Sequence, residues 1–262
     1  MKKCRIIAIA NQKGGCGKTT TAFNLGYSLA YAGNHVLLVD FDPQSNLTLA
    51  FGITNPDELA VSMHNLITGL IDGESLPDKQ KYTADNELID IIPSNKNLAV
   101  SDINLREIKN GEKILSQLLE PLRSYYNFII IDTNPYLGLL TINALTACDE
   151  VIIPVNPEYW SANGLTDLIQ TIYKIKRKVN PKISVAGILM TMCNPRTNLY
   201  KNVIKLISEH FGNKINMFNT YIPGTIKIGE ANYNSCNIID FYPKSKAAIA
   251  YKEFSQEVFE RA

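Results

Sequence analysis

Residues 11–20 read Asn-Gln-Lys-Gly-Gly-Cys-Gly-Lys-Thr-Thr, and they bring glycine, lysine and hydroxyl groups together. The three glycines would let the backbone turn so that successive N–H groups point at one anion. Lys18 could reach the terminal phosphates of a nucleotide, and the Thr19 hydroxyl could be a ligand of Mg²⁺. The stretch therefore predicts a phosphate-binding loop.

Three carboxylates follow apolar runs that are typical of buried strands. Asp40 ends the run 35–40, Asp42 comes two residues later, and Asp132 ends the run 128–132. In open α/β sheets ligands bind at the carboxyl ends of the strands, so these aspartates are expected beside the glycine loop. Asp42 could instead cap a turn before a proline, and that alternative stays open from its position alone.

The elements around the loop fit this role, because an apolar strand at 4–10 precedes it and a helical pattern at 18–32 follows it. Aliphatic blocks alternate with helical patterns along the chain. The prediction is an α/β fold, a single P-loop NTPase domain with a mostly parallel twisted sheet and helices on both faces. Further strands are expected at 88–92, 150–155, 183–192 and 217–222. Helices are expected at 97–103, 111–122, 159–179 and 245–259, and another is expected to follow residue 198 and end at 211. The stretch 53–86 is expected to be an irregular surface excursion.

Composition sets broad limits. The chain has 262 residues, of which 45% are hydrophobic and 19% charged, enough for one large domain with a sizeable core. It contains no apolar run of about 18 residues and no signal-peptide pattern, so a cytoplasmic protein without a membrane span is expected. The five cysteines have no C-x-x-C spacing, which indicates reduced thiols, and the three histidines are scattered.

Charge is unevenly distributed along the chain. Residues 1–170 carry a net charge of −7 and residues 171–262 a net charge of +8. A basic C-terminal third is compatible with an anionic polymer as partner and equally with a solvated face. The cluster Lys174–Lys178 also suits a helix C-terminus, because cations are favoured there.

The loop departs from the common G-x-x-x-x-G-K-[ST] pattern. Gln12 stands where the first glycine would fall, and Lys13 adds a second lysine. K-G-G-x-G-K-[ST] resembles the deviant Walker A motif of the ParA/MinD family of ATPases. Val39–Gln44 resembles the Walker A′ motif of that family, and Phe128–Asp132 resembles Walker B.

The resemblance covers residue 5 to about 258 and is greatest to the small ParA and chromosomal Soj-type partition ATPases. It implies one ParA-like ATPase domain over 1–262, without an N-terminal helix-turn-helix extension. It also implies ATP and Mg²⁺ as cofactors. The catalytic residues would be Lys13, which reaches the partner's nucleotide in a dimer, Lys18, and Asp42 near the attacking water.

The other site residues follow from the same resemblance. Nucleotide contacts are expected from Lys13, Gly14, Gly15, Cys16, Gly17, Lys18, Thr19, Thr20, Asn194 and Pro223. The magnesium residues would be Thr19, Asp40 and Asp132, with Asp132 holding a water on the ion. Alternatively, Lys13 could be a solvent-exposed lysine of the loop with no role at the nucleotide.

DNA contacts are implied at Arg196 and Lys227. The family's usual Pro-Arg-Asn reads Pro223-Gly224-Thr225 here, so one positive charge is absent, and Asn134 replaces a usual second proline after Walker B. From the residues alone, Arg196 could be an ordinary surface arginine. The implied partners are a second copy of the chain, non-specific DNA and a ParB-like centromere-binding protein, with association to the nucleoid in the ATP state.

Three other functions remain open at this point. One is a MinD-like positioning ATPase on a membrane or a protein cargo, although the C-terminal helix at 245–259 has an acidic end and a modest apolar stripe, which favours packing on the domain. Another is an electron-transfer ATPase like the nitrogenase iron protein, which uses cysteines after Walker B, where this chain has Thr133. A nucleotide-binding scaffold without turnover is the third, and Lys13 and Asp42 argue against it.

Overall fold

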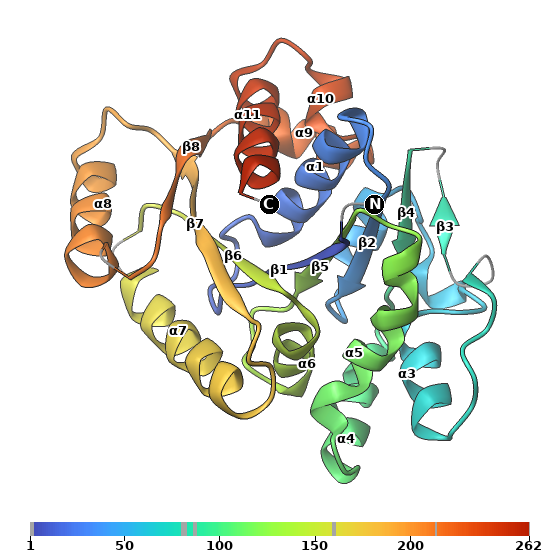
Figure 1. The fold of residues 1–262 in the computed structure, drawn as a ribbon. Coiled ribbons are helices and arrows are strands. Elements are labelled where there is room, and N and C mark those ends of the chain that lie inside the picture. Colours follow the sequence, from blue (N-terminus) through green and yellow to red (C-terminus); the bar gives the residue numbers. More distant parts are fainter. Residues whose placement is uncertain (1–2, 80–82, 86–87, 159–160, 213, 262) are drawn as a thin grey trace.

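One twisted sheet organises the protein. The structure is a computed structural model that describes residues 3–79, 83–85, 88–158, 161–212 and 214–261. Its sheet has the strand order β3-β4-β2-β5-β1-β6-β7-β8, and all neighbouring pairs are parallel except β3 with β4 (Figure 1). The strands are β1 Arg5–Ile9, β2 Val36–Phe41, β3 Ala84–Asp85, β4 Ile89–Ile92, β5 Phe128–Thr133, β6 Glu150–Val155, β7 Ser184–Cys193 and β8 Met217–Pro223. The predicted α/β fold with a mostly parallel sheet is confirmed.

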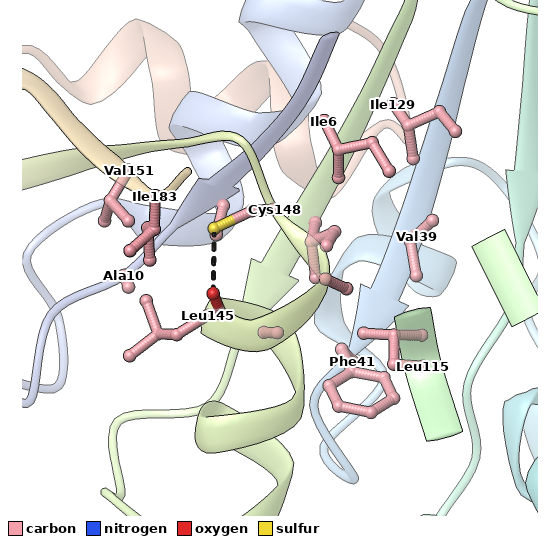
Figure 2. Close-up of a cluster of buried hydrophobic side chains, with 14 of the residues drawn as sticks. Ile6, Ala10, Val39, Phe41, Leu115, Ile129, Leu145, Cys148, Val151 and Ile183 are labelled. Atoms are coloured by element: carbon pink, nitrogen blue, oxygen red, sulfur yellow. Dashed lines mark hydrogen bonds between the residues drawn. The ribbon is translucent and has the colours of Figure 1, made fainter. Parts of the chain in front are cut away.

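The central strands are apolar on both faces because helices cover both. Along β1, Ile6 and Ala8 join one buried cluster, whereas Ile7 and Ile9 join the other. Figure 2 shows part of the first cluster, where the Cys148 Sγ lies 3.6 Å from the Leu145 carbonyl oxygen. All five cysteines are free thiols, as expected.

The helices divide between these two faces (Figure 1). One face carries α1 Lys18–Tyr31, α2 Asn46–Ala50, α9 Ile226–Tyr233, α10 Ile238–Phe241 and α11 Lys246–Glu260. The other carries α3 Met63–Ile71, α4 Leu98–Glu107, α5 Ile114–Leu119, α6 Leu139–Ala147, α7 Ser161–Lys178 and α8 Asn198–Phe211. Short 3₁₀ turns lie at Pro56–Glu58, Gly111–Lys113 and Glu120–Ser124.

Helix α1 packs unusually close to the sheet at Gly26. A Cβ on Gly26 would lie 2.7 Å from Leu38 Cδ2 and 2.9 Å from Ile89 Cδ1. A larger side chain there would require the ends of Leu38 and Ile89 to move, because interiors are close-packed. Gly26 thus leaves room for these two side chains between the sheet and the helix that follows the glycine loop.

Several expectations differ from the structure. The stretch 53–86 is more ordered than expected, because α3 buries Met63, Leu66 and Ile67 in the first cluster. The predicted helix 111–122 is α5 flanked by two 3₁₀ turns, and α9 and α10 were not predicted. Tyr159 and Trp160, expected to open the helix at 159–179, lie outside the described residues.

The C-terminal helix packs on the domain, as expected. Ala247, Ala250, Phe254 and Val258 are buried against the second cluster, whereas Ile249, expected in the same stripe, is 47% exposed. Among the described helices, none is long and apolar enough to cross a membrane.

Candidate nucleotide site

The glycine loop connects β1 to α1 and takes a conformation that needs glycine. Gly15 has φ +69° and Gly17 φ +86°, both in the left-handed region. Lys18 begins α1, so the positive end of the helix dipole lies at the loop. The loop is also held by β7, two strands away from β1, because the Thr191 Oγ1 donates a hydrogen bond of 2.8 Å to the Cys16 carbonyl oxygen.

Lys18 bends back over the loop. Its Nζ donates a hydrogen bond of 2.9 Å to the carbonyl oxygen of Lys13, and the residue is only 6% exposed. A buried ammonium with three donors has capacity left for anionic oxygens. The predicted phosphate-binding lysine therefore lies where the loop and the helix N-terminus converge.

Asp132 carries a buried carboxylate at the end of β5, and it pairs in register with Asp40 on β2. It is 0% exposed, and neither carboxylate oxygen makes a well-formed hydrogen bond within the described residues. Desolvation raises the pKa of Asp132 well above its usual value, and the nearby Asp40 raises it further, whereas the Thr19 hydroxyl lowers it. A buried carboxylate without partners is costly, so this group suits a cation or its bound waters.

Asp40 and Asp42 differ in their surroundings. The two oxygens of Asp40 accept hydrogen bonds from protein groups, and burial raises its pKa to about 6. Asp42 is 7% exposed, lines the cavity beside the loop, and accepts a hydrogen bond of 2.9 Å from the Gln44 N–H. Its pKa is raised by desolvation and lowered by Gln44 and Lys18. Asp42 is thus placed to face a ligand, while Asp40 is engaged within the fold.

A cavity of about 830 Å³ opens over the loop. From the predicted set it is lined by Gly14, Gly15, Gly17, Lys18, Thr19, Thr20 and Asp42. A Cβ on Gly14 or Gly15 would meet no atom within 4 Å, so both glycines border open space. The cavity is large enough for a nucleotide.

The far wall of this cavity was not predicted from the sequence. It is formed by Met192 near the end of β7 and by residues of α9 and the turn after it, Gly229, Asn232, Tyr233 and Ser235. Positions 229, 232 and 233 follow helical spacing, which is the signal that could have indicated this wall. Asn194 and Pro223, predicted as nucleotide contacts, are not among the described residues that line the cavity.

Lys13 lies at the edge of the loop with its side chain 25% exposed. Its Nζ pairs with the Glu158 Oε2 at 2.5 Å, and the Glu158 Oε1 accepts a hydrogen bond from Asn156. The hydrogen bond from Lys13 lowers the pKa of Glu158. The second lysine is therefore positioned by the loop after β6 of its own chain.

Arg196 follows β7, and Lys227 is the second residue of α9, which follows the neighbouring strand β8. Both are exposed, and the segments that lead to them meet where the Gly224 N–H donates to the Cys193 carbonyl oxygen at 3.1 Å. A Cβ on Gly224 would lie 3.1 Å from the Met192 carbonyl oxygen, so glycine allows this close approach. Lys227 Nζ lies 5.0 Å from the centre of the Tyr242 ring.

The residues present fit a magnesium-bound nucleotide. Asp132 offers unpaired oxygens, Thr19 a hydroxyl, and Lys18 and the helix terminus positive charge. Within the described residues no three His, Cys, Asp or Glu side chains gather to hold a metal, which agrees with Mg²⁺ being held by few protein groups and by phosphates. The fold and this site define the class: the protein is a P-loop ATPase.

Comparison with known proteins places the chain more closely. A family model described as an AAA domain matches residues 4–185. The sporulation initiation inhibitor protein Soj of Bacillus subtilis (strain 168) is 41% identical over 97% of this chain and 98% of its own. The chromosome partitioning protein ParA of Caulobacter vibrioides (strain NA1000 / CB15N) is 34% identical over 98% of this chain and 94% of its own.

A solved structure is similar over nearly the whole chain. Cobyrinic acid a,c-diamide synthase from Mycobacterium smegmatis, with bound ADP and magnesium, has a TM-score of 0.84 at 32% identity, over 98% of this chain and 95% of that one. The chain belongs to the ParA/MinD family of deviant Walker A ATPases, and within it to the Soj-type partition ATPases. The resemblance inferred from the motifs is confirmed.

Proposed function

We propose that this ATPase is a DNA-segregation switch in which ATP closes two copies of the chain over their nucleotides. ATP and Mg²⁺ are its cofactors, and Mg²⁺ neutralises charge on the phosphates. Thr19 and Asp132 would hold the ion and its waters, with Asp40 behind them. Lys18 and the N–H groups of the glycine loop would bind the phosphates, and Asp42 would orient the attacking water.

The observation that supports the dimer is the exposure of apolar side chains that line the nucleotide cavity. Tyr233 is 91% exposed and Met192 48% exposed, and both belong to the far wall of the cavity. Exposed apolar groups around a site favour burial against another surface. A second copy facing this mouth would cover them and bring its own Lys13 toward the γ-phosphate, where negative charge develops during transfer.

Non-specific DNA would bind to the exposed basic residues at the sheet edge. Arg196 follows β7 and Lys227 lies in the first turn of α9, and a dimer would present two such pairs to the phosphate backbone. Asn194, directly after β7, and Pro223, the last residue of β8, are proposed to lie close to the base of the nucleotide. A ParB-like protein would stimulate hydrolysis and release the DNA, so that ATP-bound protein collects on the nucleoid.

Size exclusion and DNA retardation test this function together. Each would be run with ATP, with ADP and without nucleotide, on the natural chain and on Asp42→Ala. We expect dimers and retarded DNA with ATP, and more persistent dimers for Asp42→Ala because ATP is no longer consumed. DNA binding that is equal in all three nucleotide conditions would contradict the proposal.

A further inference from the structure

Four buried residues beside the nucleotide cavity form a closed ring of hydrogen bonds. The Asp40 Oδ2 accepts from the Thr48 N–H at 2.8 Å and from the Thr48 Oγ1 at 2.6 Å. The Thr48 Oγ1 in turn accepts from the Ser94 N–H at 2.9 Å. The Ser94 Oγ donates to the Asp42 carbonyl oxygen at 2.9 Å, and the Asp42 N–H donates to the Asp40 Oδ1 at 3.2 Å.

This ring fixes the backbone of Asp42 from both sides. Its N–H is bound to Asp40 and its carbonyl oxygen to Ser94, while the Gln44 N–H holds its carboxylate. Asp40, Thr48 and Ser94 are each 0% exposed, so water does not compete for these bonds. The Asp42 carboxylate is therefore the part of this loop that is directed to the cavity.

Two of the ring residues lie outside every nucleotide motif of the sequence. Thr48 belongs to α2, and Ser94 follows β4, two residues after its last residue Ile92. They meet because β4 lies next to β2 in the sheet. In the ring, Thr48 and Ser94 use their side chains only through the hydroxyl groups. Neither Thr48 nor Ser94 is among the described residues that line the cavity.

We propose that Thr48 and Ser94 are positioning residues for ATP hydrolysis, which hold Asp42 in place without touching the nucleotide. The proposal rests on the function proposed above for Asp42. A displacement of about 1 Å in a catalytic group can cost about 100-fold in rate, so loss of one ring bond should lower kcat far more than it weakens nucleotide binding. Asp40 then acts mainly as the anchor of the ring.

The test compares Thr48→Val, which keeps the shape and removes the hydroxyl, with Thr48→Ser, which keeps the hydroxyl. We expect Thr48→Val and Ser94→Ala to lower kcat by about 10- to 100-fold with KM changed by less than about threefold. Thr48→Ser should restore kcat to within about threefold of the natural chain. Because ATP is consumed more slowly, both slow variants should also accumulate ATP-dependent dimers on size exclusion, as Asp42→Ala does.

Thr146→Val is the matched control, because the Thr146 hydroxyl is buried on α6 and has no hydrogen-bond partner within the described residues. The kcat of Thr146→Val should equal that of the natural chain.

Normal kcat in both Thr48→Val and Ser94→Ala, while Asp42→Ala is inactive, would overturn the positioning role alone. Normal kcat in Asp42→Ala would instead overturn the proposed function. Equal losses of kcat in Thr48→Ser and Thr48→Val would also refute the role of the hydroxyl. If a variant at position 48 or 94 does not fold, the kcat of the variant at the other position decides the test.

Discussion

Lys13 forms an ion pair with Glu158 of its own chain, with the Nζ and Oε2 atoms 2.5 Å apart. The two residues come from different loops at the carboxyl edge of the sheet, one after β1 and one after β6. The pair narrows the region that the long lysine side chain explores. In a closed dimer, Glu158 would thus present Lys13 to the partner's nucleotide.

Removing Lys13 should stop turnover and spare nucleotide binding by the monomer. Loss of one donor to a transition state costs about 3–4 kcal/mol, so Lys13→Ala should lower kcat by about 100- to 1000-fold. Glu158→Gln should lower it by only about two- to fivefold, since a partly exposed ion pair contributes about 0.5–1 kcal/mol. Steady-state hydrolysis and fluorescent nucleotide titration measure both effects, and normal turnover by Lys13→Ala would refute the proposed role.

Asp132→Asn should separate stability from metal binding. The buried carboxylate makes no well-formed hydrogen bond among the described residues, so removing its charge should stabilise the nucleotide-free protein by about 1–3 kcal/mol. The same change should weaken the Mg²⁺ dependence of ATP binding. Thermal unfolding without nucleotide and magnesium titrations with ATP measure the two effects. A lower melting temperature together with unchanged magnesium affinity would contradict this prediction.

Glu257 stabilises the start of the edge strand β8 in a pH-dependent way. Its carboxylate accepts hydrogen bonds from the Asn219 N–H at 2.9 Å and the Thr220 N–H at 2.7 Å. Although burial opposes it, the hydrogen bond from the Thr220 hydroxyl, together with these two backbone bonds and the charge of Arg261, lowers the pKa of Glu257 below the ordinary value of 4.5. Its stabilising contribution is therefore complete above that value and is lost as pH falls through the lower folded pKa.

Glu257→Gln should consequently reduce the free energy of unfolding by about 2 kcal/mol near neutral pH. The difference from the natural chain should shrink as pH falls below about 4.5. Denaturant unfolding at a series of pH values measures it, with the exposed Glu253→Gln on the same helix as control. A difference that stays constant with pH would show that the carboxylate charge is not involved.

Arg196→Ala and Lys227→Ala should weaken DNA binding without changing nucleotide binding. Each phosphate contact removed should reduce the slope of log affinity against log salt by about 1. DNA retardation with ATP at several salt concentrations measures the slope. Lys252→Ala is the control, because Lys252 is exposed on α11 and lines a groove with Tyr31, the last residue of α1, at the end of that helix away from the glycine loop. If Arg196→Ala, Lys227→Ala and Lys252→Ala all gave the same slope of log affinity against log salt, Arg196 and Lys227 would not be part of the DNA-binding surface.

The chemistry of the site could be predicted because it is local in sequence. The glycine loop, Lys18 and Thr19 are consecutive, and the aspartates end strands that are recognisable by their apolar runs. That Asp40 and Asp132 lie at the same edge of the sheet was predicted from the rule that ligands bind at carboxyl ends, whereas the strand order that pairs them came only from the structure.

The parts of the fold and the site that were not predicted depend on long-range packing, which no local sequence pattern encodes. Thr48 and Ser94 look like ordinary polar residues until β4 is placed next to β2. The wall formed by α9 was missed because this short helix of eight residues gives a weak periodic signal between two stronger elements. The burial of α3 likewise depends on contacts across the sheet face, including the Met63 N–H that donates to the Pro93 carbonyl oxygen at 2.8 Å.

The missing side chain at Gly26 has a consequence for anyone who moves this motif to another scaffold. With the Leu38 Cδ2 and Ile89 Cδ1 methyl groups less than 3 Å from where a Cβ would lie, an added methyl group would have to displace the ends of these two side chains. Alanine at this position would therefore require Leu38 and Ile89 to repack beneath the first helix. A phosphate-binding motif moved to another protein should accordingly carry this distant glycine together with the side chains that fill the space beside it.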